Sequence, residues 1–251
     1  MPAGPIHVGI GGWDYDPWRG PFYPPGLPRS KQLEHASRRV TAIEINATFY
    51  KLQKPELYAR WAAAVPAGFK FALKGSRFCT NRKALGEAGE AVGRFCGQGL
   101  AELGDKLGPI LWQFTETKRF DPDEVRAFLA LLPRSQNGVA LRHALEVRHE
   151  SFADPRFAEI AREAGVAISF ADAPGLPAID APAPGFAYAR LKGMREEEPS
   201  GYAPAELDRW AGLARGWANG GREVFIFMIN GAKVRAPAAA EALLARLGRQ
   251  D

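Results

Sequence analysis

The sequence predicts a single (β/α)8 barrel of the TIM type with parallel strands, on three observations. Eight short apolar runs follow one another along 251 residues, and seven segments with helical patterning lie between or after them. Strand–helix alternation favours a parallel sheet, and eight such repeats in about 250 residues are typical of this barrel. No linker divides the chain, so we expect one domain over residues 1–251. A doubly wound open sheet is the alternative, although it usually has fewer strands.

Apolar runs mark the expected strands, and amphipathic patterns mark the expected helices. The runs lie at 7–11, 42–46, 69–74, 109–114, 144–149, 166–172, 186–192 and 224–230. The helical segments lie near 30–39, 55–64, 87–103, 122–132, 154–164, 204–219 and 236–248. Helix starts are indicated by Ser30, Asp121-Pro122 and Asp154-Pro155, and helix ends by Gly68 and Gly165.

Composition excludes several classes of protein. The apolar fraction of 46% and the charged fraction of 24% are ordinary for a globular protein. No apolar run approaches the roughly 18 residues that a membrane span needs, and the first residues do not resemble a secretory signal. Two cysteines make neither a disulfide framework nor a zinc set. We therefore expect a cytoplasmic protein with no membrane partner and no cofactor, while its oligomeric state stays open.

The net charge of +5 and the pI of about 9.3 attract anions in general. The basic residues are scattered, and the sequence carries no zinc-finger, bZIP or RRM signature. Nucleic acid is therefore a conceivable partner but not the favoured one.

One stretch, "AIEIN" at 42–46, places Glu44 inside an otherwise apolar strand. An unpaired buried charge is expensive, so this carboxylate needs a partner or a purpose. Active sites of such barrels lie at the carboxyl ends of the strands, and alternate residues of a strand share a face. On that pattern Glu44 points into the upper barrel, among Lys74, Arg148 and Arg190.

The same reasoning predicts a site for a small anion, phosphate- or carboxylate-bearing and with a ring. We expect Glu44 or Glu146 to transfer a proton while the other orients an arginine, with Lys74 as a further catalytic candidate. The expected ligand-binding residues are Trp13, Tyr15, Asn46, Tyr50, Gln113, Arg148, His149, Asp172, Tyr188, Arg190, Lys192 and Asn230. Among these, the arginines and lysines hold the negative charge, and Trp13 and Tyr15 wall the site.

Several alternatives stay open. One alternative is that the charges form structural salt bridges inside the barrel. Glu44 and Glu146 fit a glycosidase-like hydrolase, and together with Asp172 they fit a divalent metal, although the surrounding arginines argue against it. Lys74 or Lys192 would form a Schiff base if desolvated, but a lysine beside Glu44 is expected to stay protonated. A non-catalytic nucleic-acid-binding protein is the rival from another class.

Six stretches carry a resemblance to a known family: "GGWDYDPWRGPFYPPGLP", "TAIEINATFYKL", "GFKFALKGSR", "LGPILWQF", "LEVRHESF" and "YARLKG". In this order they resemble the YecE-like family, domain of unknown function 72, over essentially the whole chain. The resemblance implies a TIM barrel and no particular activity, since the family is functionally uncharacterised.

The family pattern matches most of the candidate site. It has counterparts at Glu44, Asn46, Phe49, Tyr50, Lys74, Gln113, Glu146, Arg148, His149, Tyr188 and Arg190. The sequence departs from it at three places. Lys192 stands where the family usually has His, "FMING" keeps only Asn230 of a Phe-Asn-Asn-Asp pattern, and Phe114-Thr115 replaces prolines. At those strand ends the resemblance therefore implies no histidine or aspartate role.

Overall fold

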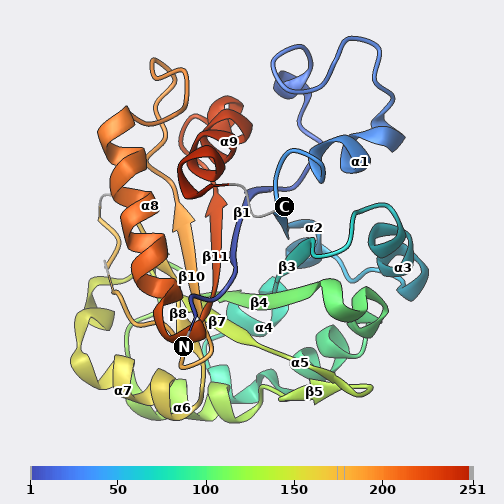
Figure 1. Cartoon of the computed structure of the whole chain (residues 1–251). Coiled ribbons are helices and arrows are strands. Elements are labelled where there is room, and N and C mark those ends of the chain that lie inside the picture. The colour runs from blue at the N-terminus through green and yellow to red at the C-terminus, as the bar shows by residue number, and fades with distance from the viewer. Residues whose placement is uncertain (1, 174, 178, 249–251) are drawn as a thin grey trace.

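A parallel sheet wraps into a nearly closed barrel, with helices outside it (Figure 1). The structure is a computed structural model that describes residues 2–173, 175–177 and 179–248. The barrel strands are β1 (Ile6–Gly11), β2 (Ala42–Ile45), β3 (Lys70–Lys74), β4 (Leu107–Gln113), β7 (His143–Glu146), β8 (Ala167–Ile168), β9 (Phe170–Ala171), β10 (Phe186–Leu191) and β11 (Glu223–Met228). Their order is β8-β7-β4-β3-β2-β1-β11-β10-β9, and every paired neighbour is parallel. The predicted parallel α/β barrel is therefore confirmed.

The sixth predicted strand, 166–172, is split into β8 and β9 at Ser169. β8 pairs with β7 and β9 pairs with β10, so both edges of the sheet lie in this one segment. The backbone N–H of Ser169 donates to the carbonyl of Leu145 at 2.7 Å, which keeps the residue against the β7 side. Each half of the segment thus pairs with a different neighbouring strand, and together the two halves complete the ring.

The α-helices follow the predicted segments with several differences. They are α1 (Gln32–Ala36), α2 (Ala47–Tyr50), α3 (Pro55–Ala63), α4 (Arg77–Thr80), α5 (Gly89–Cys96), α6 (Pro122–Ala130), α7 (Pro155–Glu163), α8 (Pro204–Ala218) and α9 (Ala236–Leu247). The expected helix at 87–103 is wrong in its length: α5 ends at Cys96, and Gly99 has a φ of 107°, which an α-helix cannot contain. The single turns α2 and α4 begin within three residues of the ends of β2 and β3 and were not predicted.

Two of the three predicted helix starts are confirmed. The Asp121 carboxylate accepts from the N–H groups of Asp123 and Glu124 at the start of α6, and Asp154 accepts from the N–H of Arg156 at the start of α7. Ser30 is not a cap, because it lies inside a short 3-10 turn and its side chain makes no capping hydrogen bond.

An antiparallel hairpin joins α6 to β7 and was also missed. Its strands are β5 (Ser135–Gln136) and β6 (Val139–Ala140). Asn137 and Gly138 between them both have positive φ, and an Asn-Gly pair is the sequence signal for such a turn.

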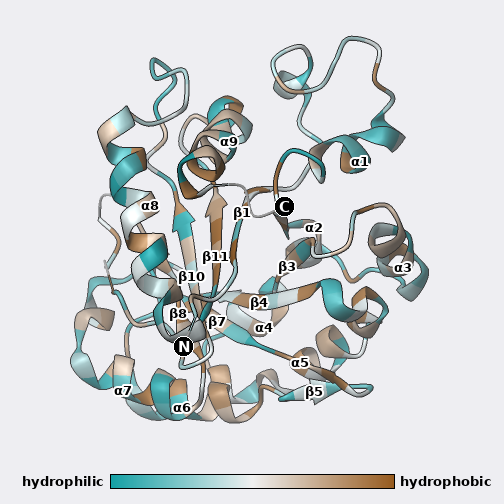
Figure 2. Cartoon of the chain, viewed as in Figure 1, coloured by the Kyte–Doolittle hydropathy of each residue, from teal (hydrophilic) through white to brown (hydrophobic). Residues whose placement is uncertain are grey.

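Buried side chains of the strands form two separate apolar clusters, as the period-2 pattern predicts. Ile43, Ile45 and Leu73 belong to the cluster beneath the helices. Ala42 and Ala72, which alternate with them, belong to a second cluster inside the barrel. Figure 2 shows brown, hydrophobic residues along much of β11, while α8 alternates hydrophobic and hydrophilic residues as a covering helix does. The side chains that share a face with Ala42 and Ala72 therefore point toward the barrel axis.

Within the described ranges, no helix is long and apolar enough to cross a membrane. Cys79 and Cys96 are both buried free thiols.

Candidate functional site

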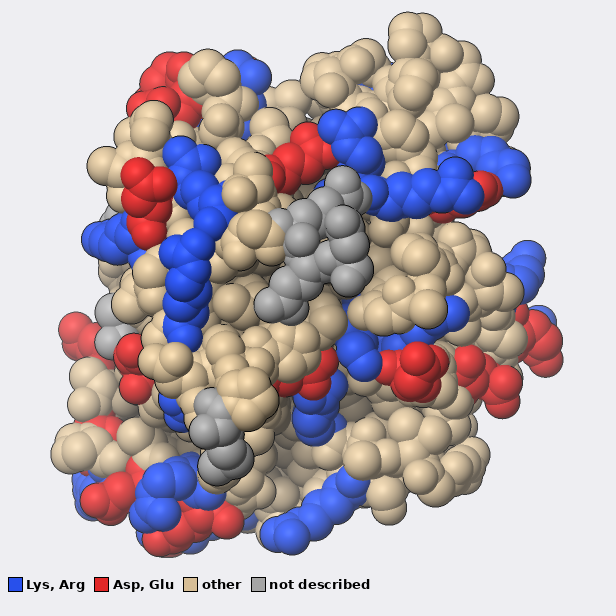
Figure 3. Space-filling view, in the orientation of Figure 1, with Lys and Arg blue, Asp and Glu red and all other residues tan. Residues whose placement is uncertain are grey.

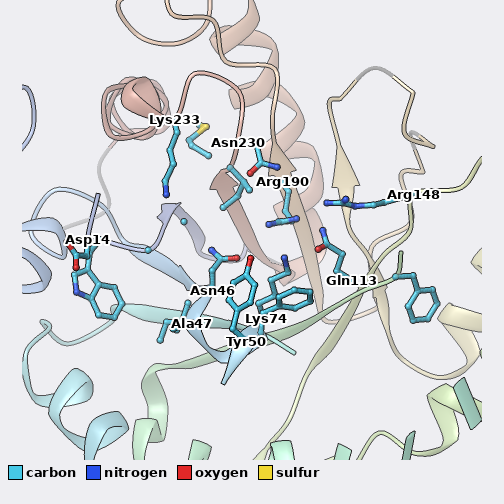
Figure 4. Close-up of a pocket in the computed structure, with 18 of the residues that line it drawn as sticks. Asp14, Asn46, Ala47, Tyr50, Lys74, Gln113, Arg148, Arg190, Asn230 and Lys233 are labelled. Atoms are coloured by element: carbon cyan, nitrogen blue, oxygen red, sulfur yellow. The ribbon is translucent and has the colours of Figure 1, made fainter. Parts of the chain in front are cut away.

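A cavity of about 930 Å³ opens at the carboxyl ends of the strands. Eight of the predicted site residues line it, among them Trp13 and Tyr50. The other six come from six strands or the segments just after them: Asn46, Lys74, Gln113, Arg148, Arg190 and Asn230. Figure 4 shows Lys74, Gln113, Arg148 and Arg190 converging in this cavity. The barrel topology thus brings together residues that lie up to 184 positions apart in sequence, from Asn46 to Asn230.

Arg190 forms the centre of the cavity floor and is held by both glutamates. Its Nε and Nη2 donate to the two carboxylate oxygens of Glu44, each at 3.0 Å, and its Nη1 donates to Glu146. Tyr188 lies deeper in the barrel, and its hydroxyl donates to Glu44 Oε2 at 2.7 Å. Arg190 is 2% exposed and both carboxylates are fully buried. Because guanidinium has five N–H donors, these contacts leave one N–H on each terminal nitrogen.

Glu146 is surrounded by cationic and amide donors. Its Oε1 accepts from Lys192 Nζ at 2.8 Å, from Arg148 Nε at 3.2 Å and from the amide of Gln113. Burial alone would raise the pKa of Glu146, but the charges and hydrogen bonds of Arg190 and Lys192 hold it well below its usual range. Glu146 therefore stays ionised and has no accessible proton to donate.

Lys74 differs from the other cations of the floor. Within the described part of the chain, no hydrogen bond or ion pair involves its Nζ, which lies 4.1 Å from the centre of the Phe49 ring. Burial lowers the pKa of Lys74 to about 8, and Arg190 acts in the same direction, while Glu44 and Glu146 oppose the shift. Lys74 is 9% exposed as a whole residue, and it lines the cavity.

Positive charge exceeds negative charge at the floor. Four cations, Lys74, Arg148, Arg190 and Lys192, surround the two buried carboxylates of Glu44 and Glu146, and all but Lys192 line the cavity. Farther out, Arg148 also donates to Glu116 at 3.0 Å, but that carboxylate is 75% exposed and solvent screens it. The floor therefore favours an anionic ligand.

Aromatic side chains wall the cavity on one side. Trp13, Phe49, Tyr50 and Trp61 line it, and Trp13 packs edge-on against Trp61 with ring centres 5.4 Å apart. Tyr50 is 62% exposed, which leaves a ring face available at the mouth. Such faces stack on the ring of a sugar, a base or another planar compound.

Seven predicted residues do not line the cavity. Glu44, Glu146 and Lys192 lie beneath it in the buried ion-pair network, and the other four lie near strand ends and bind elsewhere. The Asp172 carboxylate accepts from the N–H groups of Lys192 and Gly193 and, at 2.6 Å, from the Tyr202 hydroxyl. His149 Nδ1 accepts from the N–H of Ser151 at 3.1 Å and thereby starts a 3-10 turn. The other two are Tyr15, which packs on Trp18 and Lys233, and Tyr188.

The geometry also gives no support to the metal alternative. Within the described residues, no group of three or more His, Cys, Asp and Glu side chains is arranged to hold a metal ion. Asp172 binds backbone and Tyr202, whereas Glu44 and Glu146 both bind Arg190, so the three carboxylates do not form one ligand set.

Sequence reasoning missed several lining residues, chiefly those in loops. Lys233 lines the cavity from the loop after β11, with its Nζ 4.4 Å from the centre of the Tyr15 ring. Glu116, Thr115 and Thr117 line it from the loop after β4. The only available signal was position, because both loops leave the carboxyl end of a strand, where barrel sites are built.

Comparison with known proteins places the chain in a family. Residues 7–251 match the family described as "Protein of unknown function DUF72". The UPF0759 protein YecE of Escherichia coli K12 is 29% identical over 150 residues, which are 59% of this chain and 50% of that protein. The match thus spans about half the length of this curated relative.

Solved structures show the same fold at low sequence identity. A DUF72 family protein of Thermotoga maritima is 22% identical with a TM-score of 0.76, over 95% of this chain and 96% of that one. A DUF72 family protein of Enterococcus faecalis is 17% identical with a TM-score of 0.75, over 97% and 98% of the two chains. Since the family match extends over nearly the whole sequence, the chain belongs to the DUF72 family.

Proposed function

We propose that this protein is an enzyme that binds a small, ring-bearing anion in the cavity at the carboxyl face of the barrel. The observation that carries the proposal is the excess of cations over carboxylates at the cavity floor. In a site partly screened from water, such an excess attracts a phosphate or carboxylate more strongly than exposed charges do.

Arg190 and Arg148 are the anion-binding groups in this proposal. Glu44 and Glu146 fix the plane of the Arg190 guanidinium, and the N–H left on each terminal nitrogen can meet two oxygens of one anion. Arg148 stands at the side of the floor and its side chain is 24% exposed, so it can turn toward a ligand. Trp13 and Tyr50 supply the wall for the ring.

The two glutamates are positioning residues in this proposal, which changes the role expected from the sequence. A glycosidase-like reaction needs one carboxyl group that is protonated and reaches the substrate. Both carboxylates are fully buried beneath their donors, and the pKa of Glu146 is held low by Arg190 and Lys192 against the effect of burial. Lys74, whose amine reaches the cavity, is the catalytic residue that we retain.

A thermal-shift screen tests the proposal with the wild type, Arg148→Ala and a control, Arg94→Ala. The panel holds sugar phosphates, nucleotides, small carboxylic acids, neutral sugars, divalent metals and short DNA and RNA. Arg94 is an exposed helix residue paired with Glu90, so its loss tests only the change in net charge. A ligand at about 100 times its Kd adds about 2.7 kcal/mol, or roughly 5–10 °C in a chain of this size.

We expect a small anion to raise the Tm of the wild type and of Arg94→Ala, but not of Arg148→Ala. If only DNA or RNA raises the Tm, equally in all three proteins and with a steep loss in salt, the rival function of nucleic-acid binding is correct. The proposal includes a cytoplasmic location, which the two free thiols support. Fractionation of cells that express the tagged protein tests that part.

A further inference from the structure

We propose that Lys74 is a nucleophile that forms an imine with the carbonyl group of an anionic substrate. The inference rests on the proposed anion site and narrows its substrate to carbonyl compounds that carry a carboxylate or phosphate. The reaction classes that use such an imine are lyases and isomerases, because the protonated imine accepts the electrons of an adjacent bond.

Geometry separates Lys74 from its neighbours at the floor. Lys192 donates to Glu146 at 2.8 Å, and Arg148 and Arg190 are held by the same carboxylate. Lys74 Nζ, among the described residues, has the Phe49 ring as its near contact and no carboxylate within ion-pair distance. An amine without an acceptor can lose its proton without breaking a salt bridge.

The surroundings of Lys74 favour the neutral amine, which alone is nucleophilic. Burial disfavours the ammonium, and the positive charges of Arg190 and Arg148 disfavour it further, while Glu44 and Glu146 act in the opposite direction. The resulting pKa of about 8 leaves a neutral fraction at pH 7 that is on the order of 10²-fold above that of an exposed lysine.

Position completes the argument. Lys74 is the last residue of β3, and Arg148 and Arg190 line the same cavity. Figure 4 shows Lys74 and Arg190 projecting from opposite sides of the cavity, with the Lys74 amine pointing toward the Arg190 guanidinium. An anionic group bound by these arginines would bring a neighbouring carbonyl carbon to the amine.

The step balances without a further reactant. The Nζ lone pair adds to the carbonyl carbon, and one proton moves from nitrogen to the carbonyl oxygen to give a carbinolamine. Loss of that hydroxyl as water, with the second nitrogen proton, gives the imine. Amine and carbonyl compound are thereby converted to imine and water, and nothing is oxidised or reduced.

Reductive trapping with glyoxylate and cyanoborohydride tests the inference, with the adduct located by peptide mass spectrometry. Glyoxylate is a small aldehyde with a carboxylate, and cyanoborohydride reduces the imine to a stable secondary amine. The proteins are the wild type, Lys74→Arg, which keeps the charge, and Lys233→Arg, which removes the other lysine that lines the cavity. Arg148→Ala and added inorganic phosphate test the part played by the anion site.

We expect labelling of Lys74 on the order of 10²-fold faster than that of exposed lysines. The adduct should be absent in Lys74→Arg and retained in Lys233→Arg, and its rate should fall in Arg148→Ala or with phosphate. The rate should rise about tenfold per pH unit below the pKa and level off above about pH 8.

Two results would overturn the inference, and the thermal-shift screen distinguishes them from failure of the proposed function. Labelling spread over exposed lysines in the wild type refutes the nucleophile, whether or not the variants fold. If that occurs while anions still raise the Tm of the wild type and not of Arg148→Ala, the proposed function stands alone. If Lys74 is labelled at a rate that neither phosphate nor Arg148→Ala changes, the anionic substrate is refuted and the anion site with it.

Discussion

The two ends of the barrel each hold a cluster of ionisable side chains, and the clusters differ in charge balance. At the amino end Glu223 accepts from His7 Nε2 at 2.8 Å and from Arg142, so one carboxylate has one permanent cation. At the carboxyl end Glu44 and Glu146 face Arg190, Lys192, Arg148 and Lys74. The first cluster is balanced within itself, whereas the second is balanced only when an anion joins it.

This difference separates a structural ion pair from a candidate site within one fold. The Glu223 carboxylate is held ionised by His7 and Arg142, which lower its pKa to about 2 against the effect of burial. Above its ordinary pKa near 4.5 it stabilises the fold, and this contribution is lost as the pH falls toward 2. On the face of the molecule drawn in Figure 3, basic and acidic side chains lie side by side, so surface charge does not mark one end of the barrel there. What distinguishes the carboxyl end is therefore its cavity floor.

Arg190→Met should produce the largest loss of stability. It leaves two fully buried carboxylates without their shared partner, which costs about 3–5 kcal/mol in the free energy of unfolding. Arg142→Met is the matched change at the amino end, where both side chains are partly exposed, and should cost about 1–3 kcal/mol. Urea denaturation at pH 7 measures both, and equal losses would contradict the role of Arg190 as the shared partner.

Lys74→Met should stabilise the protein, by about 1–3 kcal/mol at pH 7. The folded pKa of Lys74 is lowered to about 8 from 10.5, so the unfolded chain binds the proton more tightly. The wild type therefore gains stability as the pH rises from about 8 to 10.5, and the advantage of the methionine should vanish above that range.

Lys70→Met is the control for this change, because Lys70 begins the same strand and donates to the exposed carbonyl of Asp105. Its stability should change little at any pH. If Lys74→Met is less stable than the wild type, Lys74 belongs to a stabilising ion pair, as Arg142 does with Glu223.

Arg148→Ala should have the smallest effect on stability, below about 1 kcal/mol. The Arg148 side chain is 24% exposed. When it is removed, Glu146 keeps its hydrogen bonds from Arg190, Lys192 and Gln113. Denaturation curves of wild type and variant should nearly coincide, while the ligand-induced Tm shift is lost. A large destabilisation would place Arg148 with the structural ion pairs.

Much of this fold could be predicted because its signals are local. Period-2 alternation assigned Glu44 to the face of Ala42 and not to that of Ile43, and the two apolar clusters bear this out. Aspartate followed by proline located two helix starts correctly. The break at Ser169 carries no such signal, because it depends on which neighbouring strand each half of 166–172 meets.

The site was less accessible to sequence reasoning because its pairings are not local. The period-2 alternation predicts that Arg190 shares the inward face with the glutamates. It does not show that the one guanidinium of Arg190 binds both Glu44 and Glu146. Asp172 and His149 looked like mouth residues, yet Asp172 binds the N–H groups of Lys192 and Gly193 on the next strand segment, and His149 binds the N–H of Ser151. Lys233 begins a short 3-10 turn, Lys233–Arg235, to which neither the strand period nor the α-helix period applies.

The central claim is that the carboxyl-end cluster carries positive charge that its own carboxylates do not balance. The most direct test is the titration of the Lys74 amine by NMR with labelled lysine, assigned by its loss in Lys74→Arg. The account predicts a midpoint near pH 8, which moves upward when an anion identified by the thermal-shift screen is added. A midpoint near 10.5 that no anion changes would show that the cluster is already balanced, and the site would then be structural.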